Sequence, residues 1–113
     1  MINTIYIDEI TRILKDKGAE KVILFGSYAN GNPDEYSDLD LLVITSDDFI
    51  PQTNRRTMDI YHRYNSGIRK FRESISIDLL VYTHAMFEAI MAEPNNFFKE
   101  IDEKGKVLYE TVN

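Results

Sequence analysis

Two aspartates separated by one residue, Asp38 and Asp40, have the clearest chemical meaning in this chain. They open the apolar run 38–44, which is typical of a β-strand, and side chains two residues apart on a strand share one face, roughly 6–7 Å apart. Carboxylates placed side by side repel each other unless a cation lies between them. Mg²⁺ typically binds one or two carboxylates together with substrate phosphates. The pair therefore predicts a metal site for phosphate chemistry.

A third carboxylate, Asp78, lies within another predicted strand, residues 74–82. An unpaired charge flanked by Ile77 and Leu79 would be costly to bury. If this strand is the neighbour of the strand with Asp38 and Asp40, all three carboxylates can share cations, as in two-metal phosphoryl-transfer sites. The simpler alternatives are outward-facing, solvated charges for the pair, and a buried carboxylate at a helix end for Asp78.

Gly26 and Ser27 follow the apolar run 21–25, which predicts a buried strand. Glycine lets the backbone approach a polyphosphate closely, and the following N–H groups and the serine hydroxyl can donate hydrogen bonds to it. Ten residues separate Ser27 from Asp38, and the composition predicts on the order of 0.002 chance matches to this spacing. The spacing therefore indicates one functional unit. A turn or cap role for Ser27 is the alternative, and no histidine lies where a serine nucleophile would need a base.

The elements that must position these residues follow from apolar periodicity and turn residues. The predicted order is a helix over 4–17, a strand over 21–25, a loop over 26–37, a strand over 38–44, a helix over 54–71, a strand over 74–82, a helix capped by Thr83 and running to about Glu93, a short helix capped by Asn95 or Asn96 and closed by Gly105, and an apolar tail over 107–109. This order predicts an α/β fold class in which helices pack on a small sheet.

Composition narrows the class of protein. The chain has 113 residues, 43% hydrophobic and 28% charged, which predicts one domain over 1–113. A net charge of −6 argues against a protein that grips nucleic acid, and the absence of cysteine excludes thiolate chemistry. No apolar run is long enough for a membrane span, and the first residues lack a signal-peptide pattern, so we expect a cytoplasmic protein. The two histidines, His62 and His84, are predicted to be structural.

One segment is basic within this acidic chain. Residues 53–72 contain six basic residues and one acidic residue, Asp59, a local charge of +5. This segment could dock an acidic partner or steer a triphosphate. The alternative is a solvated helix face with i,i+4 pairs between Arg55, Asp59 and Arg63.

Phe97 and Phe98 are expected in the core, with part of that cluster exposed to a partner.

The segment 26–31, Gly-Ser-Tyr-Ala-Asn-Gly, followed by Ser-Asp-Leu-Asp at 37–40, resembles the signature of the DNA polymerase β-like nucleotidyltransferase superfamily. The short length is similar to that of the minimal nucleotidyltransferases (MNT), the antitoxin-type partners of HEPN toxins. The resemblance continues through 75–81 and 105–109, and so covers most of the chain. It implies the polymerase β-like nucleotidyltransferase fold with a small mixed sheet.

The resemblance also implies roles for individual residues. Gly26 and Ser27 would hold the β- and γ-phosphates of ATP, Asp38 and Asp40 would bind two Mg²⁺ ions, and Asp78 would complete the catalytic metal site. The implied reaction transfers AMP to a tyrosine of a cognate HEPN toxin and silences its ribonuclease activity, as in a type VII-like toxin–antitoxin pair. A homo-oligomer is compatible with this reading.

Two other functions stay open from the sequence. One is nucleotidyl transfer to a small-molecule hydroxyl, such as that of an aminoglycoside, and the other is a non-catalytic antitoxin that only binds its partner. Asn30 departs from the resembled pattern, in which arginine is common at this position. Its neutral side chain predicts weaker triphosphate binding, or a phosphate contact from a basic residue elsewhere.

Overall fold

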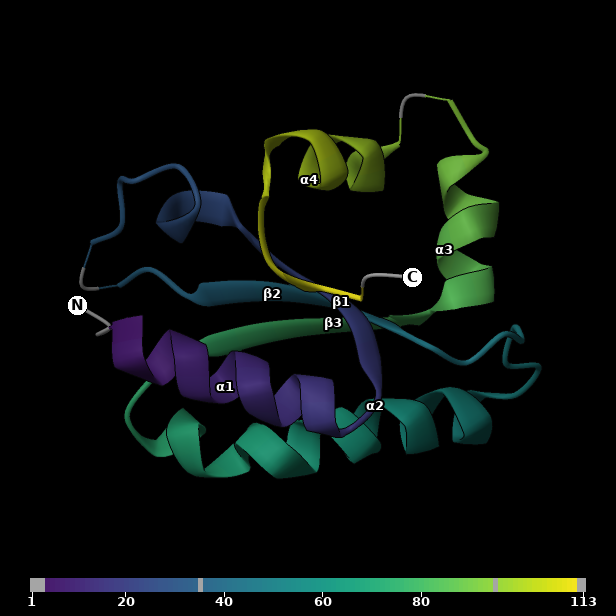
Figure 1. The fold of residues 1–113 in the computed structure, drawn as a ribbon, viewed down its shortest axis with the longest axis horizontal. Coiled ribbons are helices and arrows are strands. Elements are labelled where there is room, and N and C mark those ends of the chain that lie inside the picture. The colour runs from purple at the N-terminus through teal and green to yellow at the C-terminus, as the bar shows by residue number, and fades with distance from the viewer. Residues whose placement is uncertain (1–3, 35, 95, 112–113) are drawn as a thin grey trace.

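The structure, a computed structural model, describes residues 4–34, 36–94 and 96–111 (Figure 1). The elements in chain order are α1 (Thr4–Asp16), β1 (Ala19–Phe25), the 3₁₀ turn η1 (Gly26–Tyr28), β2 (Leu39–Thr45), α2 (Asn54–Ile68), the 3₁₀ turn η2 (Arg69–Glu73), β3 (Ile77–Thr83), α3 (His84–Met91), α4 (Phe97–Lys104) and β4 (Lys106–Glu110). None of the helices in the described part of the chain is long and apolar enough to cross a membrane.

The four strands form one mixed sheet in the order β3-β2-β1-β4. Strands β2 and β3 are parallel and are connected through α2, whereas β1 pairs antiparallel with both β2 and β4. Helices α1 and α2 cover one face of the sheet, and α4 lies over the other (Figure 1). The predicted α/β class with helices on a small mixed sheet is confirmed.

Strand periodicity divides the core into two layers. On β2, Leu41 and Val43 belong to the larger cluster, which α1 and α2 complete, while Leu42 and Ile44 belong to a smaller cluster with Ile101 of α4. Because side chains alternate between faces, even-numbered positions on β2 face α4. Asp40 therefore belongs to the face that α4 covers.

The predicted helix caps explain where the later helices begin. The Thr83 hydroxyl accepts a hydrogen bond from Met86 N (3.1 Å), and Asn96 Oδ1 accepts one from Lys99 N (2.9 Å). Each cap pairs a backbone N–H that the first turn of a helix leaves without a partner. The cap roles predicted for Thr83 and for Asn96 are confirmed, while Asn95 lies outside the described residues.

Several boundaries differ from the prediction. Strand β1 begins at Ala19 rather than at residue 21, and α3 ends at Met91 rather than at about Glu93. The helix expected over 54–71 ends at Ile68, and its apolar spacing continues through the 3₁₀ turn η2, so the strand expected from residue 74 begins at Ile77. The apolar tail at 107–109 is an edge strand, β4, paired with β1. Arg72 of η2 fixes the start of β3, since its Nη1 donates to the Ile77 carbonyl (2.6 Å).

His84 links α3 to β1 through Nδ1, while its other ring nitrogen pairs within α3. Nδ1 lies 2.6 Å from Glu20 Oε2, and Nε2 lies 2.9 Å from Glu88 Oε1. The hydrogen bond to Glu20, with a further contribution from Glu88, raises the pKa of His84 above its ordinary value. Glu20 lies near the start of β1, the end of that strand opposite to Gly26. This arrangement agrees with the structural role predicted for His84.

A pH dependence of stability follows from this link. We expect wild-type protein to exceed a His84→Gln variant in free energy of unfolding most clearly below the ordinary histidine pKa, and this advantage to disappear as pH rises through the raised pKa. The charged imidazolium is the form that the two carboxylates stabilise. Because the side chain is 38% exposed, screening limits the effect to about 1 kcal/mol or less. Urea denaturation on either side of neutral pH measures it, and a difference that does not change with pH would contradict the assignment.

Candidate active site

The turn after β1 brings glycine against a carboxylate. Gly26 has a φ of +74°, and a Cβ added there would lie 2.1 Å from Asp40 Oδ2. Only glycine adopts this conformation readily and leaves room for the carboxylate. The Gly26 carbonyl then accepts hydrogen bonds from the N–H groups of Ala29 and Asn30, both at 3.1 Å. The turn thus holds the chain directly over Asp40.

The parallel pairing of β2 with β3 brings the third carboxylate to the same place. Asp40 and Asp78 are direct register partners, and Asp38 lies just before β2. Ser76 Oγ donates to Asp38 Oδ1 (2.5 Å). All three carboxylates therefore lie where β1 ends and where β2 and β3 begin, as expected if the two Asp-bearing strands are neighbours.

Electrostatics confirm that these carboxylates affect one another. Partial burial raises the pKa of Asp40 above its ordinary value, and the negative charges of Asp78 and then Asp38 raise it further. The repulsion between such carboxylates is relieved when one of them is protonated or when a cation binds between them.

The chemistry of the three carboxylates fits Mg²⁺, although their side chains do not converge on one point in this structure. Within the described ranges, no group of three or more His, Asp or Glu side chains is close enough to hold a metal ion. The three carboxylates supply the hard oxygen ligands that Mg²⁺ prefers, and the ion characteristically keeps several positions for water and substrate phosphates. Asp38 and Asp78 are exposed, so they are accessible to an ion from solvent.

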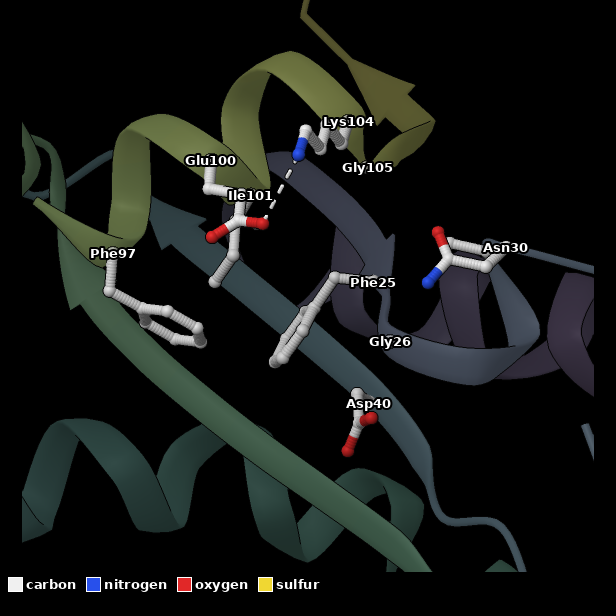
Figure 2. Close-up of a pocket in the computed structure, with 10 residues that line it drawn as sticks. Phe25, Gly26, Asn30, Asp40, Phe97, Glu100, Ile101, Lys104 and Gly105 are labelled. Carbon is white, nitrogen blue, oxygen red and sulfur yellow. Dashed lines mark hydrogen bonds and ion pairs between the residues drawn. The ribbon is translucent and has the colours of Figure 1, made fainter. Parts of the chain in front are cut away.

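A cavity of about 300 Å³ lies between this site and α4 (Figure 2). Gly26 and Asp40 line it, together with Asn30 of the loop after η1. Ser27, Asp38 and Asp78 are not among its lining residues. The structure therefore places Gly26 and Asp40 at the cavity and the other candidate residues beside them in the fold.

Helix α4 contributes residues that sequence reasoning missed. Phe97, Glu100 and Lys104 line the cavity opposite the Gly26 turn. Phe97 is 57% exposed and makes edge contacts with Phe25 and Phe98, so only part of the Phe97–Phe98 cluster is in the core, as expected. In the sequence, the only signal was an aromatic residue at the first position of a short helix. Whether this side chain faces a cavity depends on how α4 packs against the sheet, which the sequence does not show.

The basic segment lies on the other face of the sheet. Arg63 pairs with Asp47 (3.0 Å) and not with Asp59, as the alternative of a solvated helix face supposed, because the loop after β2 passes beside α2. Helices α2 and α4 are on opposite faces of the sheet (Figure 1), and the cavity lies on the side of α4. No residue of this segment lines the cavity, and the solvated, partner-facing and steering roles considered for it remain predictions.

The fold and the site geometry define a class of protein. Residues 7–109 match the nucleotidyltransferase domain family. A Methanocaldococcus jannaschii protein, named for an inferred protein adenylyltransferase activity, is 32% identical over 93 residues, which cover 82% of this chain and 88% of that protein. The chain belongs to the nucleotidyltransferase family, and the family resemblance seen in the sequence is confirmed.

Two solved structures share the fold. A toxin–antitoxin crystal structure with AMP-PNP aligns with a TM-score of 0.57 at 20% identity, over 97% of this chain and 75% of that chain. The structure of the tri-AMPylated Shewanella oneidensis HEPN toxin in complex with MNT antitoxin aligns with a TM-score of 0.53 at 18% identity, over 97% and 74%. The predicted nucleotidyltransferase fold is thus confirmed.

Proposed function

We propose that residues 1–113 form a single Mg²⁺-dependent domain that transfers AMP from ATP to a protein hydroxyl, a tyrosine of a cognate HEPN toxin. The chain then acts as the antitoxin of a type VII-like pair. The observation that carries the proposal is the packing of the Gly26 turn on Asp40, with Asp78 in register beside it, at the edge of a cavity. A nucleotidyltransferase needs a phosphate-binding turn and metal-binding carboxylates in this relation.

Each residue of the site has a distinct task in this proposal. The backbone of Gly26 and the hydroxyl of Ser27 bind and orient the β- and γ-phosphates. Asp38 and Asp40 would hold two Mg²⁺ ions, with Asp78 completing the catalytic site, and the metal would supply neutralisation of the charge that develops on the phosphate oxygens. Asp78 assists removal of the proton from the acceptor hydroxyl. The acceptor oxygen bonds to the α-phosphorus as the bond to the bridging oxygen breaks, and pyrophosphate leaves with that electron pair.

The choice of a protein acceptor rests on the relatives. The M. jannaschii protein is named for protein adenylyltransferase activity, and the S. oneidensis structure contains an AMPylated HEPN toxin with its MNT antitoxin. Because the site offers positioning and charge neutralisation with little covalent chemistry, the acceptor is set by what docks beside the cavity. Because the proposed donor is ATP, we expect the reaction to take place in the cytoplasm.

Growth rescue tests the proposal. We expect co-expression of wild-type protein to restore growth to cells that express the cognate HEPN toxin, and the Asp38→Ala/Asp40→Ala variant to fail, because it lacks the metal ligands. An Asp59→Ala variant, which removes a carboxylate from exposed α2, serves as the matched control. Rescue by the double variant would indicate a non-catalytic binding antitoxin. Failure of both proteins, with AMP transfer to an aminoglycoside in vitro, would indicate a small-molecule acceptor.

A further inference from the structure

The cavity beside the Gly26 turn is poor in positive charge. Of the described residues that line it, Asp40 and Glu100 are acidic and Lys104 is the single cation. On the loop side, Asn30 is neutral. A triphosphate carries several negative charges, and in an acidic protein a cation close to the phosphates strengthens its binding beyond what bound metal supplies. Lys104 is therefore the side chain of the cavity lining that could contact the phosphates of such a ligand.

Helix α4 is held firmly over the sheet, so that Lys104 has a defined place. Ile101 is buried in the smaller core cluster, and Lys21 of β1 pairs with Asp102 (3.1 Å). A Cβ on Gly105 would lie 2.5 Å from Ile23 Cγ2 and 2.4 Å from the Ile101 carbonyl oxygen. The residue after Lys104 can therefore approach β1 closely only because it is glycine.

The ammonium of Lys104 has a weak partner in this structure. Its Nζ lies 3.4 Å from Glu100 Oε1, and both side chains are more than 60% exposed. An exposed i,i+4 pair of this kind holds its members loosely. Figure 2 shows Lys104 and Glu100 above the cavity, with Asn30 and Asp40 on its other sides. A lysine on a flexible stem can leave such a pair for a more highly charged ligand.

We infer that Lys104 binds the triphosphate of the nucleotide and supplies, from α4, the cation that Asn30 does not supply from the loop. This inference rests on the proposed function, since it takes the cavity to be the nucleotide site.

Calorimetric titration with Mg²⁺ and AMP-PNP tests this inference without any acceptor. We expect Lys104→Gln to raise the Kd for AMP-PNP about 10-fold to 100-fold, the range expected for loss of a charged hydrogen bond. Lys104→Arg keeps most of the affinity. The Kd for AMP, which lacks the β- and γ-phosphates, stays unchanged in Lys104→Gln. Lys99→Gln, which removes the same charge from α4 at a position outside the cavity lining, is the matched control.

A second substitution, at Asn30, tests whether the lost charge itself explains the effect. Adding Asn30→Arg to Lys104→Gln returns a cation to the cavity, and we expect it to recover most of the lost AMP-PNP affinity. Unchanged AMP-PNP binding in Lys104→Gln would overturn the inference, as would an equal loss in Lys99→Gln. Wild-type protein that binds AMP-PNP but transfers no AMP to a HEPN toxin would contradict the proposed function and leave the role of Lys104 intact. Wild-type protein that binds no AMP-PNP would overturn both.

Discussion

Replacing Asp40 with asparagine is expected to reduce AMP transfer by about a thousandfold or more while leaving the metal-free protein at least as stable as wild type. The loss of activity follows because a bound metal contributes several kcal/mol of transition-state stabilisation, and each factor of ten in rate corresponds to about 1.4 kcal/mol. The gain or retention of stability follows because the Asp40 carboxylate is partly buried and is also repelled by Asp78 and Asp38, as its raised pKa indicates. Few residues combine these two effects.

The pH dependence of stability gives this prediction a second readout. A carboxyl group whose pKa is raised in the folded state favours folding in its protonated form. In the absence of metal, the free energy of unfolding of wild-type protein should therefore fall as pH rises from the ordinary Asp pKa through the raised pKa of Asp40. Asp40→Asn removes that decline.

Thermal denaturation in a metal chelator, followed by circular dichroism, measures the stability, and AMP transfer is measured separately with Mg²⁺. Asp59→Asn on α2 is the matched control, because it changes the net charge equally at an exposed position outside the site. A large fall in the melting temperature of Asp40→Asn, or full activity in that variant, would show that Asp40 is a structural residue and that the metal site lies elsewhere.

Substituting alanine for Gly26 is the second change with a large expected effect. The positive φ costs an L-residue about 1–2 kcal/mol, and the new Cβ would lie 2.1 Å from Asp40 Oδ2. Asp40 must then move away from the turn. Because a displacement of about 1 Å in a catalytic group can cost about 100-fold in rate, we expect AMP transfer to fall by at least this factor.

Gly31 offers a control that separates backbone strain from the contact with Asp40. Its φ is +79°, close to that of Gly26, and a Cβ added there would have no atom within 4 Å. Gly31→Ala therefore carries the same strain without the collision. We expect it to lose stability in urea denaturation, as Gly26→Ala does, but to retain most of its activity. Equal activity in the two variants would mean that the contact of Gly26 with Asp40 has no catalytic importance.

The sequence predicted the parts of the site that depend on short-range geometry. The i, i+2 spacing of Asp38 and Asp40 places both on one face of a strand, and a glycine after an apolar strand indicates a turn. The position of Asp78 depended on a condition, that its strand lies next to the strand of Asp40, and the register between Asp40 and Asp78 meets it.

The residues from α4 could not be predicted in the same way. Phe97 and Lys104 reach the cavity because β4 pairs with β1 and because Gly105 allows α4 to approach Ile23. Both are contacts between segments about eighty residues apart in the sequence, and local pattern does not encode them. The end of α2 was missed for another reason, since Phe71 of the 3₁₀ turn η2 continues the apolar spacing of the helix.

The most direct test of the central claim is an intact-mass spectrum of the cognate HEPN toxin after incubation with this protein, Mg²⁺ and ATP. The Asp38→Ala/Asp40→Ala variant serves as the control. We predict that the toxin gains the mass of one or more AMP units with wild-type protein, gains none with the control, and gains none when Mg²⁺ is removed by a chelator. A toxin of unchanged mass, in a stable complex with wild-type protein, would contradict AMP transfer to a protein acceptor.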